Sequence, residues 1–211
     1  MKSILNRDTL KNHFTYNWWK YLLVLVLGIL GVDLLYTVTE PRIPDDKKIE
    51  VIVCGASLEQ DFNAWMERVR ENQMSDMQKM ELTVIPDDDT AIQYLTVRMA
   101  TQGGDLYILP RSMFENMMTN GALLPLEDDQ ELMNILSGFG QMDLGWGTEA
   151  TSRDKHLYGI SLRYLSGMDR YFWLSSGYVS LLRYGKNLDN AREFLRILCE
   201  EMQTPIPAAS E

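Results

Sequence analysis

The sequence predicts an α/β domain built on a parallel sheet and preceded by one transmembrane helix. Two patterns point to this class: an apolar run of 21 residues near the start, and β-branched apolar runs that alternate with amphipathic segments after it. Buried parallel strands read as continuous apolar runs, and helices between them supply the right-handed crossovers that cover both faces of the sheet.

The apolar run extends from Trp18 to Val38. As a helix, its 21 residues span about 30 Å, which matches the hydrocarbon core of a bilayer. Trp18, Trp19, Tyr21 and Tyr36 stand near its ends, where aromatic rings favour the lipid–water interface. We therefore expect this segment to anchor the chain in a lipid bilayer.

The charge distribution predicts the orientation of that anchor. Residues 1–20 carry a net charge of +3, whereas the chain from Glu40 onward carries −12. The positive-inside rule then places the N-terminus in the cytoplasm and the acidic domain outside the cell membrane. No small-residue cleavage pattern follows the run, so we expect the anchor to be retained. An acidic domain repels phosphate backbones, so no nucleic-acid partner is expected.

Asp33 lies within the apolar run, near its outer end. One interpretation is a carboxylate that reaches headgroups or water, and this is the one we favour. The other is a membrane-embedded acid that contacts a partner.

The predicted organisation has five parts. They are a cytoplasmic tail (1–17), the transmembrane helix (18–38), a proline-containing linker (39–48), the extracytoplasmic α/β domain (49–204) and a disordered tail (205–211).

Within the domain, four strands are expected, at residues 49–54, 82–85, 105–109 and 157–162. Four helices are expected, at residues 58–72, 87–101, 112–118 and 187–202. Ser57 and Ser112 are placed to cap two of these helices. Residues 169–174 and 178–183 flank a Ser-Ser-Gly turn and suggest a hairpin or a bent strand pair.

Histidine and cysteine, on which many catalytic and metal sites depend, are scarce, with two of each in the chain. Cys54 and Cys199 each lie in an apolar run and are expected to be buried thiols. The consecutive acids Asp87–Asp89 suit a helix start better than a calcium loop, which alternates its ligands. No nucleotide-binding, nucleophile-elbow or zinc motif is present, so we expect no metal, no cofactor and no enzyme.

Four stretches, in order over residues 49–202, resemble the extracellular solute-binding proteins of ABC importers, in particular the carbohydrate-type group. Residues 104–109 resemble the third strand of that family, and residues 114–128 resemble its helix ending in Gly, followed by Leu-x-Pro-Leu and acids. Residues 156–161 resemble the strand that enters the hinge, although Ser161 stands where the family usually has Pro. Residues 187–198 resemble its late helix.

This resemblance implies a periplasmic-binding-protein-like fold truncated to about one lobe. Only 25 residues separate Leu162 from Leu188, where the family inserts much of a second lobe. A transmembrane helix also replaces the family's lipid-anchored cysteine. One lobe leaves a sugar largely hydrated, so any carbohydrate binding should be weak, and a protein partner is expected instead.

Ligand- or partner-binding residues are expected at the carboxyl ends of the parallel strands, where Ser57 and Arg111 offer polar groups. Trp146 stands between two glycines in a segment expected to be flexible. Its indole either stacks on a sugar or a partner, or folds back over the core.

Trp173 alternates with polar residues along an expected strand, which predicts a core position. Tyr158 and Tyr164 are candidates through the resemblance alone.

The leading interpretation is a membrane-tethered extracytoplasmic binding or interaction module. The alternative is a structural subunit of a membrane complex, which acts through its transmembrane helix and basic tail.

Overall fold

The computed structural model describes residues 7–39, 43–58, 61–88, 90–138, 144–174 and 176–203. The chain divides into two units, residues 1–42 and 43–211. Pro41, Asp89, Ser175 and the predicted tail 205–211 lie outside the described residues.

The first unit contains one helix, α1 (Arg7–Thr39), of 33 residues. It begins inside the predicted tail and includes the whole apolar run from Trp18 to Val38. That run is long and apolar enough to cross a membrane, and none of it is buried. A helix with an apolar surface on all sides is not stable in water by itself, because nothing covers that surface.

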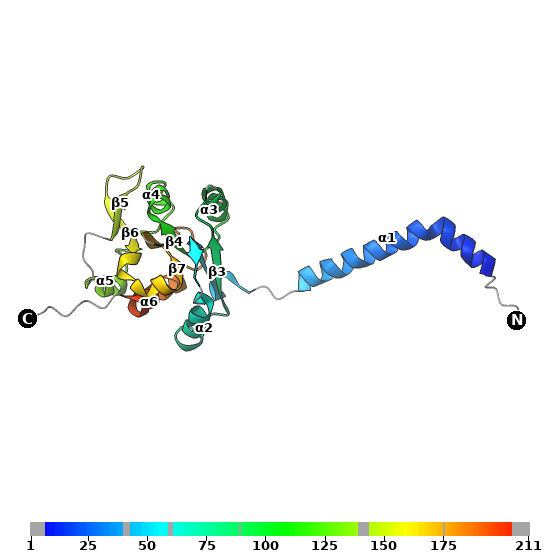
Figure 1. The fold of residues 1–211 in the computed structure, drawn as a ribbon, viewed down its shortest axis with the longest axis horizontal. Coiled ribbons are helices and arrows are strands. Elements are labelled where there is room, and N and C mark those ends of the chain that lie inside the picture. The colour runs from blue at the N-terminus through cyan, green and yellow to red at the C-terminus, as the bar shows by residue number, and fades with distance from the viewer. Residues whose placement is uncertain are drawn as a thin grey trace, which may run out of the picture. The chain divides into compact units, whose positions relative to one another are not determined.

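The second unit is the α/β domain, in which a six-stranded sheet lies between two layers of helices (Figure 1). Its elements in chain order are η1 (Asp45–Lys47), β1 (Lys48–Cys54), β2 (Ala56–Ser57), α2 (Phe62–Asn72), β3 (Lys79–Ile85), α3 (Ala91–Ala100), β4 (Leu106–Pro110), α4 (Arg111–Thr119), α5 (Gln130–Leu136), β5 (Gly145–Thr148), β6 (Lys155–Ser161), η3 (Leu162–Tyr164), η4 (Ser166–Arg170), β7 (Phe172–Trp173), β8 (Gly177–Leu181) and α6 (Leu188–Met202). The four predicted strands are confirmed as β1, β3, β4 and β6. The four predicted helices are confirmed as α2, α3, α4 and α6.

The sheet is mixed, with the strand order β3-β1-β4-β8-β6-β5. Strand β1 pairs in parallel with β3 and β4, but β8 is antiparallel to both β4 and β6, and β5 is antiparallel to β6. Four strands therefore run in one direction and two in the other. The predicted parallel sheet is therefore correct in part: the four predicted strands run in one direction, but β5 and β8 make the sheet mixed, because a buried apolar run has the same sequence pattern in either direction.

The runs 169–174 and 178–183 do not pair with each other, so neither the predicted hairpin nor the bent strand pair is observed. Strand β7 pairs with β2 in a separate two-stranded sheet, in which Trp173 lies opposite Ala56. Strand β8 enters the main sheet instead, and Pro110 of β4 pairs with Gly177. A Cβ atom on Gly177 would lie 2.7 Å from the carbonyl oxygen of Leu109, so this close approach requires glycine.

Two of the predicted helix caps are corrected. Ser57 lies in β2, and α2 is capped by Asp61, whose Oδ1 accepts a hydrogen bond from the Asn63 amide at 2.9 Å. Ser112 lies inside α4, which follows directly from Pro110 at the end of β4. In both cases a neighbouring residue with a suitable backbone conformation begins the helix.

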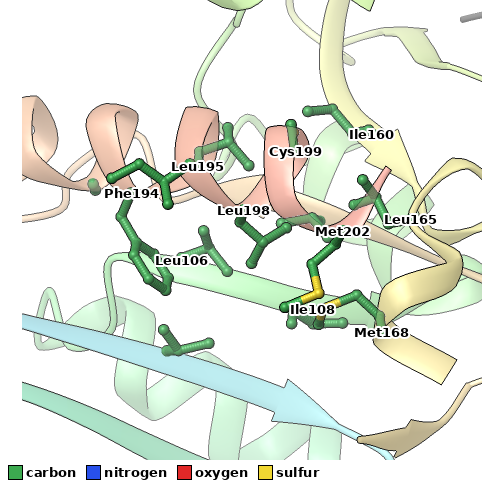
Figure 2. Close-up of a cluster of buried hydrophobic side chains, with 14 of the residues drawn as sticks. Leu106, Ile108, Ile160, Leu165, Met168, Phe194, Leu195, Leu198, Cys199 and Met202 are labelled. Atoms are coloured by element: carbon green, nitrogen blue, oxygen red, sulfur yellow. The ribbon is translucent and has the colours of Figure 1, made fainter. Parts of the chain in front are cut away.

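Two helix layers cover the two faces of the sheet. Helices α3 and α4 lie on one face, and α2 and α6 on the other (Figure 1). Figure 2 shows α6 over strand β4, with buried side chains of one core cluster around it: Leu106, Ile108, Ile160, Leu165, Met168, Phe194, Leu195, Leu198, Cys199 and Met202. Cys199 and Cys54 are free buried thiols, as predicted.

Candidate functional site

A groove lies at the carboxyl edge of the sheet, where β1, β3 and β4 end. Strand β8 begins at the same edge, because it runs antiparallel to β4. The groove has a volume of about 810 Å³ and is lined by Cys54, Gly55, Ala56, Ser57, Val84, Pro86, Asp87, Pro110, Trp173, Leu174 and Ser176. We call it the Trp173 groove. Ser57 is one of the lining residues, and the sequence predicts a binding role for it at this edge of the sheet.

Trp173 is the most exposed aromatic side chain of the domain among the described residues, at 75%. Its neighbour Phe172 is 3% exposed and packs edge-on against Phe62, with ring centroids 5.1 Å apart. Successive side chains of a strand point to opposite sides, so burial of Phe172 turns the indole of Trp173 outward. The core position predicted for Trp173 is wrong, because in this strand Phe172 faces the core and Trp173 faces outward.

The strand that carries Trp173 is held in place on both sides. The Leu58 amide donates a hydrogen bond to the Tyr171 carbonyl oxygen at 2.8 Å, next to the β2–β7 pairs. On the other side, a Cβ atom on Gly55 would lie 2.8 Å from Cδ1 of Leu174. The glycine lets the side chain of Leu174 pack directly on the end of β1. The exposed indole therefore stands on a fixed backbone.

One wall of the groove is acidic. Asp87 lines it and forms no hydrogen bond or ion pair with any other residue that the structure describes. Asp88 is already engaged, since its Oδ1 accepts hydrogen bonds from the amide and hydroxyl of Thr90, at 2.8 and 2.6 Å. The hydroxyl and amide of Thr90 lower the pKa of Asp88.

The thiol at the base of the groove is not activated. Burial raises the pKa of Cys54 to about 11, and Asp87 and Asp88 add to this by repelling the thiolate. The Cys54 sulfur lies 3.3 Å from Sδ of Met113 and 4.0 Å from the Pro86 carbonyl oxygen. A thiol in this setting stays protonated near neutral pH and is a poor nucleophile.

A second groove, of about 530 Å³, brings two further candidates together. Arg111 and Trp146 line it with Phe114, Glu115, Met118, Thr119, Leu144, Gly145, Lys155 and Tyr178. The guanidinium of Arg111 is exposed, and its Nε donates to Oε1 of Glu115 at 2.8 Å.

Trp146 is half-buried in β5 and packs against the main core, in line with the predicted alternative in which its indole folds back over the core. Residues 142 and 143 of the segment expected to be flexible lie outside the described residues. Its flanking glycines serve close packing. A Cβ atom on Gly145 would lie 2.6 Å from Cζ of Phe114, and one on Gly147 would lie 2.0 Å from Sδ of Met118.

The two tyrosine candidates line neither groove. Tyr158 is buried, and its hydroxyl donates to Oε1 of Glu149 at 2.8 Å. Burial raises its pKa to about 12, and the contact with Glu149 adds to this. Tyr164 is half-buried in η3 and packs against the main core.

Within the described part of the chain, no group of three His, Cys, Asp or Glu side chains is placed to hold a metal ion. The residues expected at the bilayer, Trp18, Trp19, Tyr21, Asp33 and Tyr36, are all exposed on α1.

A scan against protein families finds no match, and a search of curated proteins finds none either. Among solved structures, a similar chain is a cyclo/maltodextrin-binding protein complexed with maltotetraose, at 18% identity and a TM-score of 0.37. The match covers 58% of this chain and 29% of that one, so it spans less than a third of that protein's length.

Proposed function

We propose that this protein is a membrane-tethered, extracytoplasmic interaction module that contacts a partner protein through the Trp173 groove. The observation that carries the proposal is Trp173, 75% exposed on a backbone fixed by β2. An indole in water leaves a large apolar surface uncovered, and tryptophan is among the residues that most often dominate binding energy at protein interfaces. Such a residue on a rigid strand is an anchor for a partner.

The shape of the groove favours a protein over a small solute. Most of the residues that line it are exposed: Ala56, Ser57, Val84, Pro86, Asp87, Trp173 and Ser176. Small-molecule sites bury about 70–90% of their ligand. A sugar stacked on Trp173 would keep much of its hydration, and we expect an affinity no better than about millimolar.

Helix α1 supports the proposed tether. Its apolar run is long enough to span a bilayer, and its surface is uncovered in the described structure. The charge of +3 over residues 1–20 and of −12 from Glu40 onward favours a cytoplasmic N-terminus.

The proposal is tested by photo-crosslinking in native membranes. A p-benzoylphenylalanine in place of Ser176, which lines the groove, should give one adduct of defined mass. The same group in place of Tyr184, which is 62% exposed beyond the opposite end of β8, should not. Trp173→Ala should abolish the adduct. Equal labelling from both positions, or micromolar binding of maltotetraose in a calorimetric titration, would contradict the proposal.

One observation favours a second candidate function, that of a structural subunit acting through α1. Asp33 is exposed within the apolar run, where a carboxylate is costly unless it reaches water or a partner. Replacing residues 18–38 with an unrelated transmembrane helix should preserve the Ser176 adduct if the domain is the active part. Loss of the adduct on this replacement would favour the subunit function.

A further inference from the structure

The Trp173 groove contains an acid without a counter-charge. Asp87 lines the groove and pairs with no described residue, and no Lys or Arg is among the described lining residues. Asp88 is satisfied by Thr90, so of the two described acids in this run Asp87 is the one available to a partner. A contact that covered Asp87 with an apolar surface would desolvate a charge without compensation, which is strongly unfavourable.

An indole and a carboxylate in one groove suit a cation. A cation over the face of Trp is attracted by the negative π-face of the ring, and Trp is the most effective of the aromatic residues in this respect. A charged donor would also form a charge-assisted hydrogen bond to Asp87. The domain as a whole carries −12, so a basic partner surface is also favoured at longer range.

We infer that the partner protein presents an arginine side chain to the Trp173 groove, with its guanidinium stacked on the indole of Trp173 and hydrogen-bonded to the carboxylate of Asp87. This inference rests on the proposed function. Arginine fits better than lysine because its guanidinium is planar, stacks on aromatic faces, binds a carboxylate with two donors and is more weakly hydrated than an ammonium.

The first test uses the full chain in phosphatidylcholine nanodiscs, with its tryptophans replaced by fluorotryptophan. Fluorine NMR then reports each indole, and Trp173→Phe identifies the signal of Trp173. The probe is acetyl-Gly-Arg-Gly-amide, and its control is the same peptide with citrulline, which has nearly the same shape without the charge. We expect a saturable shift of the Trp173 signal with the arginine peptide, and an affinity at least about threefold lower with citrulline.

The matched variants test the role of Asp87. Asp87→Asn should lower the affinity for the arginine peptide about threefold to tenfold, while Asp87→Glu should largely preserve it. Asp154→Asn removes an exposed carboxylate that lies outside the groove and should have no effect. Equal affinity for the arginine and citrulline peptides, or an Asp87→Asn protein that binds like the wild type, would overturn the arginine inference.

The crosslinking experiment separates this inference from the function on which it rests. The Ser176 adduct should form in the wild type, and Asp87→Asn should lower its yield about threefold to tenfold, as for the arginine peptide. That result supports both the proposed function and the arginine contact. An unchanged yield in Asp87→Asn overturns the arginine contact and leaves the proposed function standing. If the wild type forms no adduct, the proposed function fails, and with it the partner's arginine.

Discussion

Ala56 and Trp173 lie opposite each other in the two-stranded sheet formed by β2 and β7. This pairing joins the end of β1 to a segment more than 100 residues later in the chain. It places an indole at the carboxyl edge of the main sheet, beside residues from β1, β3 and β4. The Trp173 groove is therefore a product of tertiary structure, assembled from segments that no local motif connects.

The phase of β7 predicts opposite effects for two adjacent aromatic residues. Phe172→Ala removes a buried ring that packs against Phe62 and should lower the free energy of unfolding by about 3–5 kcal/mol. Trp173→Ala removes an exposed ring and should change it by less than about 0.5 kcal/mol. Urea unfolding of the full chain in nanodiscs, followed by circular dichroism, measures both. Similar losses for the two variants would show that the phase of the strand is wrong.

The glycines around Trp146 should be intolerant of a methyl group. Gly145→Ala would place a Cβ atom 2.6 Å from Phe114 and 2.9 Å from the backbone oxygen of Gly159, and the backbone cannot easily yield. We expect a loss of about 1–3 kcal/mol in the free energy of unfolding, seen as a lower Tm. Gly185→Ala is the control, since its nearest contact would be 3.3 Å, to the side chain of Leu188. A Gly145→Ala protein as stable as Gly185→Ala would indicate a flexible loop at Trp146.

Cys54 should react slowly at neutral pH. Burial raises the pKa of its thiol from 9.0 to about 11, so folding favours the protonated form. The contribution of the Cys54 thiol to the free energy of unfolding is fully present below about pH 9 and is lost as the pH rises toward about 11. In that range the thiol loses its proton in the unfolded chain but keeps it in the folded one. Iodoacetamide labelling followed by mass spectrometry should show little modification of Cys54 at pH 7.5. Fast labelling of folded protein at that pH would contradict the burial.

The ion pair between Glu149 and Arg183 should stabilise the fold only while Glu149 is ionised. The guanidinium of Arg183 pairs with both carboxylate oxygens and, with the Tyr158 hydroxyl, lowers the pKa of Glu149 below its ordinary 4.5. This contribution is present above about pH 4.5 and is lost as the pH falls through the lowered value. Arg183→Gln should therefore destabilise the domain by about 1–3 kcal/mol at pH 7, and this difference should narrow in acid. A difference that is constant from pH 7 to pH 3 would exclude the ion pair as its source.

Local patterns predict the longer elements, but neither the short ones nor the pairing of the strands. The apolar runs at 49–54 and 105–109 and the stripe of Phe194, Leu195 and Leu198 correspond closely to β1, β4 and α6, because burial on one face directly shapes the sequence. The direction of β8 is not predictable from local patterns. It depends on pairing with β4, a strand about 70 residues earlier in the chain. Helix α5 was missed because it is only seven residues long.

The site shows the same division. The sequence predicts that Ser57 and the strand-end residues near it lie at the carboxyl edge of the sheet, and there they line the Trp173 groove; their role in binding stays a prediction. Trp173 was misplaced: alternation along a strand shows that two faces differ but does not say which one is buried when both carry aromatic residues. At Trp146, neighbouring glycines suggested flexibility, whereas they permit contact with Phe114 and Met118. Composition alone does not distinguish these two uses of glycine.

The central claim is that the surface around Trp173 is covered by a partner in the membrane. Hydroxyl-radical footprinting compares the oxidation rate of Trp173 in native membranes with that in purified full-length protein, with Tyr184 as the internal reference. We expect Trp173 to be oxidised readily in the purified protein and to be protected severalfold in membranes, with Tyr184 unchanged. Equal oxidation of Trp173 in both preparations would contradict the account.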